Sequence, residues 1–180
     1  IGLDQLENAK YATETALILN PTSIDAKLNL ARILSLENST SKSIEVYEEL
    51  LKSTEIIRPD LIPLIKYNLS FEYLSQGSLI KGWSFYDFGF NNEISISQSR
   101  RPNRKFKVTQ WIGEDLKGKT LLIWGEQGVG DEILFMSMLS DVERKEKNII
   151  IECDSRLVTI VKRSFPFFDV RPSAFNNDGS

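Results

Sequence analysis

The feature that most constrains this chain is the stretch 119–131, with the sequence Lys-Thr-Leu-Leu-Ile-Trp-Gly-Glu-Gln-Gly-Val-Gly-Asp. Residues 120–124 are β-branched, aliphatic or aromatic, which predicts a short buried strand. A glycine-rich loop comes next. A strand, a glycine loop and a helix in this order begin a βαβ unit, so we expect a parallel sheet in the second half of the chain. The helix is indicated by apolar residues at helical spacing: Ile133, Leu134, Met136, Met138 and Leu139.

The glycine loop is the main candidate site. Glycine lets backbone N–H groups come close to a ligand, and the first turn of a helix favours negative charge. We therefore expect the loop around Gly125, Gly128 and Gly130 to bend sharply and to aim unpaired amides and the Asp131 carboxylate into an open crevice.

The rest of the second half continues the alternation of strands and helices, which implies a parallel sheet with right-handed crossovers. Asp154 or Ser155 can cap a helix that ends before Pro166. Two or three strands are too few to bury both faces of such a sheet, so we expect the chain to be a fragment. The further predicted elements are a helix at about 131–144, strands at 148–153 and 168–171, and a frayed tail at 176–180.

The first half contains an internal repeat. The residues at 9, 13, 16 and 21 correspond in type to those 34 positions later, and those at 30–34 and 43–50 correspond to residues 39 positions later. A 34-residue period with five residues inserted near 56–60 explains both offsets. The period predicts antiparallel helix pairs, with small residues such as Ala31, Ser70, Gly82 and Gly89 at the closest approaches. The predicted helices are 3–19, 23–37, 41–53, 60–75 and 79–90.

This segment resembles the tetratricopeptide family. The resemblance implies a peptide-binding groove on the inner face of the first helices. The alternative is a spacer, in which the same side chains face solvent or the next domain. The groove residues would be Asp25, Leu28 and Arg32, followed by Tyr67 and Phe71.

Composition excludes several classes of function. The net charge of −3 argues against a protein that coats nucleic acid or an anionic membrane, and no apolar run approaches the about 20 residues that span a bilayer. The chain has no histidine, so imidazole-dependent nucleophilic catalysis and histidine zinc sites are excluded, and we expect no metal. The single cysteine, Cys153, suits a reducing compartment, and no export signal is visible, so we expect a cytoplasmic protein.

Residues 91–118 are predicted to be a linker between the repeats and the α/β domain at 119–180. A basic run around Pro102 meets a phosphate-bearing ligand or forms a solvated linker, and the second is the more common case. Trp111 is expected to pack under the edge of the following domain. The basic residues are Arg100, Arg101, Arg104, Lys105 and Lys107.

The motifs occur in a recognisable order: Gly82-Trp83-x-x-Tyr86, then Trp111-x-Gly113-Glu114-x-Leu116-x-Gly118-Lys119, then Glu126-Gln127-Gly128-x-Gly130-Asp131. This order resembles bacterial proteins in which tetratricopeptide repeats are fused to a glycosyltransferase domain related to the heptosyltransferases. The resemblance implies a two-lobed glycosyltransferase B-type fold, of which this chain holds the repeats at 1–90 and the start of the acceptor lobe.

The resemblance also implies roles for the loop residues. Asp131 matches the base that accepts a proton from the acceptor hydroxyl, and Glu126, Gln127, Gly128 and Gly130 would contact an acceptor sugar or glycan. The donor would be a nucleotide sugar acting as substrate, with no separate cofactor. Its lobe is not expected in this chain, which would then be inactive alone.

Other interpretations of the loop remain open. A P-loop requires Lys and Ser or Thr after the glycines, where this chain has acids. A dinucleotide loop has a different glycine order, although Glu152 or Asp154 lies where its ribose-binding acid is expected. The third interpretation is a structural turn that binds no ligand, in which Asp131 only caps the helix. The second hypothesis for the whole protein is a non-catalytic repeat scaffold for protein–protein interaction.

Overall fold

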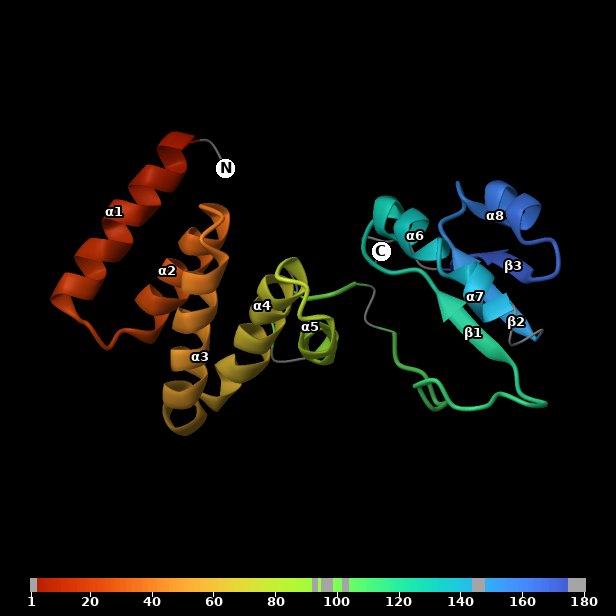
Figure 1. Ribbon diagram of the computed structural model, residues 1–180, viewed down its shortest axis with the longest axis horizontal. Coiled ribbons are helices and arrows are strands. Elements are labelled where there is room, and N and C mark those ends of the chain that lie inside the picture. Colours follow the sequence, from red (N-terminus) through yellow and green to blue (C-terminus); the bar gives the residue numbers. More distant parts are fainter. Residues whose placement is uncertain (1–2, 92–93, 95–98, 102–103, 144–147, 175–180) are drawn as a thin grey trace. The chain divides into compact units, whose positions relative to one another are not determined.

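The computed structural model describes residues 3–91, 94, 99–101, 104–143 and 148–174. The chain divides into two compact units, residues 1–99 and 100–180, which are described separately (Figure 1). The first unit is entirely helical in its described part, and the second combines helices with a small parallel sheet. The expected class, α followed by α/β, is confirmed at this level. The boundary after residue 99 divides the predicted linker 91–118 between the two units.

Five α-helices form the first unit, close to the predicted ranges. The predicted helix at 60–75 begins with a 3₁₀ turn, Pro59–Leu61, and the one at 79–90 ends with another, Asp87–Phe90. The helices are α1 (Leu3–Leu19), α2 (Ile24–Leu36), α3 (Thr40–Ile57), α4 (Ile62–Ser75) and α5 (Leu79–Tyr86).

Local sequence explains where these helices begin and end. The hydroxyl of Ser23 accepts the backbone N–H of Ala26 (3.3 Å) and caps α2. Between α4 and α5, Gly77 has a φ of 78°, a left-handed conformation that glycine adopts without a steric penalty.

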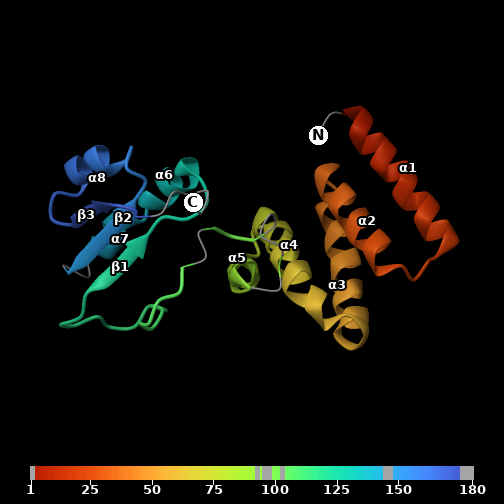
Figure 2. The ribbon, with the colours of Figure 1, turned by 180° about the vertical axis from the view of Figure 1, so that it is seen from behind.

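Successive helices of the first unit pack against one another (Figure 2), and α2, α3 and α4 supply the buried residues of its core. The predicted close approaches at Ala31, Ser70 and Gly82 are confirmed. Ala31 and Ser70 have no exposed surface, and a Cβ at Gly82 would lie 2.7 Å from Leu74 Cγ. The cation of Lys66 in α4 lies 4.4 Å from the ring centroid of Phe88 in the 3₁₀ turn after α5. The core residues are Leu28, Ala31, Tyr47, Leu50, Ile65, Leu69 and Tyr73.

The second unit contains a three-stranded parallel sheet with the order β1-β2-β3. In its register, Ile123 lies opposite Ile151, and Ile151 lies opposite Val170. The predicted parallel sheet is confirmed, but the single predicted helix at 131–144 is two helices interrupted at 137–138. The elements are β1 (Leu121–Trp124), α6 (Val129–Met136), α7 (Leu139–Glu143), β2 (Ile149–Cys153), α8 (Val158–Ser164) and β3 (Asp169–Pro172).

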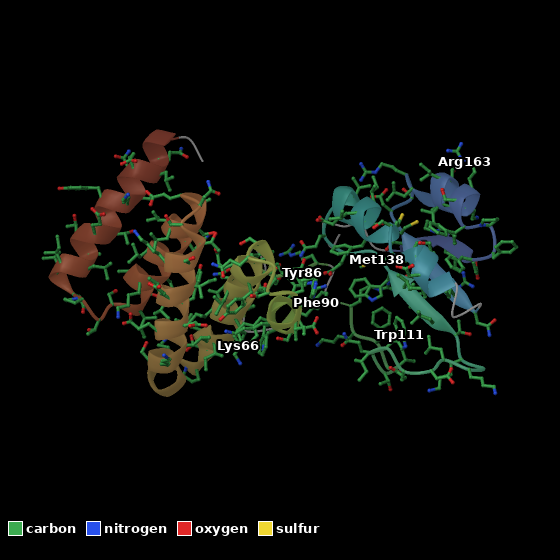
Figure 3. The ribbon with its side chains drawn as sticks, in the orientation of Figure 1. Lys66, Tyr86, Phe90, Trp111, Met138 and Arg163 are labelled. Carbon is green, nitrogen blue, oxygen red and sulfur yellow. The ribbon has the colours of Figure 1, made fainter. Side chains whose placement is uncertain are left out.

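The helices cover one face of this sheet. Along β2, residues 149, 151 and 153 are buried and alternate with half-buried residues, and the buried ones join Leu139 of α7 and Val161 of α8 in one core. Trp111 is half-buried against this core, as predicted, and its indole N–H donates to the carbonyl of Glu114 (2.8 Å; Figure 3).

The apolar residues of α6 do not form a single buried face. Ile133 and Leu134 are exposed, and the inward stripe consists of Val129, Glu132 and Met136. An acidic residue takes the central inward position because its carboxylate is bonded there, as described below. Among the described helices, none combines the length and apolar character needed to cross a membrane.

Candidate functional site

The glycine loop lies at the carboxyl ends of β1 and β2. In a parallel sheet these ends meet at one edge, where ligands commonly bind. The N–H of Gly125 donates to the carbonyl of Glu152 (2.8 Å), so the sheet ladder continues one residue beyond β1 before the chain turns. The loop and the residues that follow β2 therefore form one edge.

Glu132 of α6 contacts both Gly125, which follows β1, and Asp154, which follows β2. Its side chain is buried, and its Oε2 accepts the backbone N–H of Asp154 (2.8 Å). The same carboxylate lies against the Cα of Gly125, where an added Cβ would be only 2.5 Å from Oε1. Gly125 is therefore needed for close packing against a buried carboxylate.

The expectation that the loop amides face a ligand is wrong for three of them. The N–H of Gly125 is bonded to Glu152, that of Gln127 to the carbonyl of Arg101 (2.6 Å), and that of Gly128 to Asp131 Oδ2 (3.1 Å). These amides already have acceptors within the chain, so they are not available as an anion-binding cradle.

The expectation that the basic run is a solvated linker is wrong for two of its members. Arg100 is buried, and its guanidinium forms an ion pair with Glu126, with Nε donating to Oε2 (2.7 Å). Arg104 donates to Glu152 Oε2 (2.6 Å). Lys105 and Lys107 are exposed, as a solvated segment requires. Pro102 lies outside the described residues.

Arg104 also lies over two aromatic rings. Its Cζ is 4.7 Å from the centroid of Phe106 and 5.3 Å from that of Trp124, and the two rings are 5.5 Å apart. Trp124 and Glu152 are cross-strand neighbours on the face of the sheet opposite the helix-covered core. The arginine is thus held by a carboxylate and two rings on this face.

Asp154, the other acid considered for a ribose contact, pairs with Arg156. Hydrogen bonds from the Arg156 side chain and backbone lower the pKa of Asp154 to about 2. Because Glu152 and Asp154 both bond to arginines, the structure gives no support to the dinucleotide interpretation.

Asp131 occupies a different environment from its neighbours. It is the third residue of α6, after the N-cap Gly128, and its side chain is exposed. One carboxylate oxygen accepts the Gly128 N–H, so Asp131 supports the cap from the third position of the helix, whereas the alternative interpretation made Asp131 the N-cap residue itself. The described residues place no lysine or arginine in an ion pair with it. Gly130 is also exposed, and a Cβ there would have no neighbour within 4 Å.

The predicted groove residues of the first unit differ in their exposure to solvent. Leu28 and Tyr67 are buried, so their side chains do not line a surface. Asp25, Arg32 and Phe71 are exposed. The groove itself stays a prediction, and these three exposed residues are its remaining candidate contacts. Tyr67 packs edge-on against Phe71, with ring centroids 5.0 Å apart.

Sequence reasoning missed Glu132, Arg100 and Arg104 as parts of this site. A glycine that ends a strand and an acid seven residues later give a weak signal for Glu132. For the arginines, the signal was the run of cations ahead of a loop that carries Glu126. Within the described part of the chain, no group of three or more potential metal-ligating side chains comes together.

Comparisons with known proteins add one relative. No family model matches the chain, and no solved structure matches it. The chain is 29% identical over 115 residues to Protein FlbA of Caulobacter vibrioides, a region that covers 62% of this chain and 19% of that protein. Because 115 residues exceed the length of either compact unit, the similarity extends across the boundary at residue 99. The similar region spans about a fifth of the relative.

Proposed function

We propose that the second unit supplies the acceptor side of a glycosyltransferase that moves a sugar from a nucleotide-sugar donor to an acceptor hydroxyl. The repeats of the first unit are then tetratricopeptide repeats, and the sheet is part of a Rossmann-like lobe. The observation that carries this proposal is the contrast among the acids at the loop edge. Glu126, Glu152 and Asp154 are bonded to arginines, and Glu132 is buried and bonded to the Asp154 amide, whereas Asp131 is exposed.

An exposed carboxylate at this edge suits a general base. As the acceptor oxygen attacks the anomeric carbon, the bond from that carbon to the nucleotide diphosphate breaks, and the hydroxyl proton passes to Asp131. The nucleotide diphosphate leaves with the bonding electrons. The Gly128 N–H fixes one oxygen of Asp131 and leaves the other for the acceptor.

The test replaces the carboxylate without changing its shape. In the full-length parent protein, supplied with nucleotide sugars and acceptors, Asp131→Asn is expected to lower the transfer rate ~100-fold or more. The melting temperature should hardly change, because a first-turn carboxylate contributes only ~0.3–1 kcal/mol to a helix. An Asp131→Asn protein with wild-type activity would refute the proposal.

Asp115→Asn is the matched control. Asp115 is also an exposed acid of the second unit, and its carboxylate accepts a nearby backbone N–H, that of Lys117 (2.9 Å), so its loss has a similar local effect on stability. Transfer by this variant should equal that of the wild type. Equal losses in the two variants would mean that the effect is structural.

A second candidate function is a repeat scaffold for protein–protein interaction, and an outer stripe on α1 favours it. We define the outer stripe as Tyr11, Ile18 and Leu19, which are 75%, 80% and 81% exposed. The 34-residue offset places exposed polar residues at the equivalent positions of α3: Glu45, Lys52 and Ser53.

Continuation of the repeat array does not account for the outer stripe. Helix α3 packs against α2 before it and α4 after it, and it still leaves the equivalent positions exposed. Apolar side chains at these positions of α1 therefore favour contact with a different protein.

The test transfers the polar face of α3 onto α1. The triple variant Tyr11→Glu, Ile18→Lys, Leu19→Ser and the wild type are compared on a peptide array. Peptides bound by the wild type should be lost by the triple variant and kept by Ile80→Ser, a control that removes an exposed apolar side chain on α5. Absence of any bound peptide would count against the scaffold.

A further inference from the structure

The segment that opens the second unit is bonded to the glycine loop at several points. We define the strap as Arg100, Arg101, Arg104, Lys105 and Phe106. Its Arg100 side chain bonds Glu126, its Arg101 carbonyl accepts the Gln127 N–H, and its Arg104 side chain bonds Glu152. The strap thus connects the loop after β1 with the end of β2.

The two ion pairs of the strap are shielded from solvent. The side chains of Arg100 and Glu126 are 10% and 19% exposed, and those of Arg104 and Glu152 are 14% and 20% exposed. Ion pairs of this kind are screened by salt less than those on an open surface. Arg100 and Arg104 already bind carboxylates, so these two arginines are part of the structure of the edge and do not form a phosphate-binding patch.

The strap contacts the loop at Gln127, the loop residue with the least favourable backbone conformation. Gln127 has a φ of 63°, a left-handed conformation that side chains other than glycine rarely adopt. Its N–H is the group that bonds the Arg101 carbonyl, and its neighbour Glu126 is the residue that bonds Arg100. Such a conformation persists only when its surroundings enforce it.

Gln127 is followed directly by the cap of α6. The next residue, Gly128, donates its N–H to the Asp131 carboxylate. The path from strap to carboxylate therefore runs through Arg101, Gln127, Gly128 and Asp131, each joined to the next by a hydrogen bond or a peptide bond.

We infer that the strap is a positioning element, in which Arg100 and the Arg101 carbonyl hold Gln127 in its left-handed conformation and so fix the orientation of Asp131. The effect on loop structure stands on these contacts alone. The effect on sugar transfer rests on the proposed function.

The first test measures the loop itself by amide hydrogen exchange and nitrogen-15 shifts in the full chain. Arg100→Gln and Glu126→Gln should each speed exchange at Gln127 and Gly128 by about tenfold or more, with exchange at Ile150 and Ile151 unchanged. In the double variant, exchange at Gln127 and Gly128 should be no faster than in either single variant, because both substitutions remove the same ion pair between Arg100 and Glu126. Arg100→Lys should restore part of the protection.

Arg58→Gln is the matched control. It removes an arginine from an ion pair with Asp60 in the first unit, just before α4. Exchange at Gln127 should not change in this variant. Unchanged exchange at Gln127 in both Arg100→Gln and Glu126→Gln, or additive effects in the double variant, would overturn the inference.

The second test separates this inference from the proposed function. In the active parent protein, Arg100→Gln should lower kcat with little change in the KM for the nucleotide sugar, and Arg100→Lys should recover part of kcat. If Asp131→Asn stays fully active, the proposed function fails, while the exchange result still decides the strap. If Arg100→Gln speeds amide exchange in the loop but leaves kcat at the wild-type value, the strap has no effect on catalysis.

Discussion

Cys153 illustrates how burial sets the chemistry of a single residue. It ends β2 inside the core of the second unit, and burial together with the nearby acids Glu132 and Asp154 raises the pKa of its thiol to about 11. The thiolate is the reactive form, so the folded protein holds this cysteine inert at neutral pH.

Alkylation should therefore report unfolding. At pH 8, iodoacetamide is expected to leave Cys153 unmodified in the native protein and to label it rapidly in urea, as measured by intact mass. Since the folded pKa lies above the unfolded value of 9.0, the thiol stabilises the fold below about pH 9, and this contribution is lost as the pH rises toward about 11. Equal labelling rates in buffer and urea would contradict the prediction.

Gly125 and Glu132 make a second residue-scale prediction. Gly125→Ala places a methyl group against a buried carboxylate that also bonds the Asp154 N–H. We expect the free energy of unfolding of the second unit to fall by about 1–3 kcal/mol in urea titrations. Gly130→Ala is the control, because its Cβ meets open space, and it should be neutral or slightly stabilising.

At the scale of elements, three helices of the first unit meet at one carboxylate. Glu48 of α3 accepts hydrogen bonds from the Tyr73 hydroxyl of α4 (2.5 Å) and from Lys81 of α5 (3.0 Å). The cation of Lys81 also lies 4.0 Å from the centroid of the Tyr73 ring. These bonds, that from Tyr73 foremost, lower the pKa of Glu48.

Glu48→Gln should weaken the junction of these helices. Its side chain is partly exposed, so we expect a loss of only about 1 kcal/mol, measured by thermal unfolding of the first unit. Because the folded pKa is lowered, the contribution of Glu48 is present above the unfolded value of 4.5 and is lost as the pH falls below it. The variant should therefore show a flatter acid limb than the wild type.

At the scale of the whole molecule, the two cores share no residues. One core runs from Leu28 to Tyr73 in the first unit, and the other from Leu116 to Val170 in the second. Separate cores unfold as separate cooperative units when few contacts join them.

Calorimetry should therefore resolve two transitions. Leu50→Ala, in the helical core, is expected to destabilise only one of them, by about 2–5 kcal/mol. Gly125→Ala should move only the other. A single transition shifted by both variants would show that the chain unfolds as one cooperative body.

The sequence by itself determined the order of the helices and strands, apart from the break that divides the predicted helix at 131–144 into α6 and α7. The internal repeat predicted the ranges of α1 to α5, and short local runs of residues predicted β1, β2 and β3. The small residues Ala31, Ser70 and Gly82 located the helix contacts because a repeat places equivalent residues in equivalent environments.

Only the tertiary structure decided which charged groups meet. Arg100 pairs with Glu126 across 26 residues, and Arg104 with Glu152 across 48 residues. No local pattern encodes pairings at such long sequence separations. The sequence therefore predicted a solvated linker, whereas the structure shows a strap bonded to the glycine loop. The burial of Glu132 and the occupied amides at Gly125 and Gln127 depend in the same way on segments that are far apart in the chain and become neighbours only after the sheet has formed.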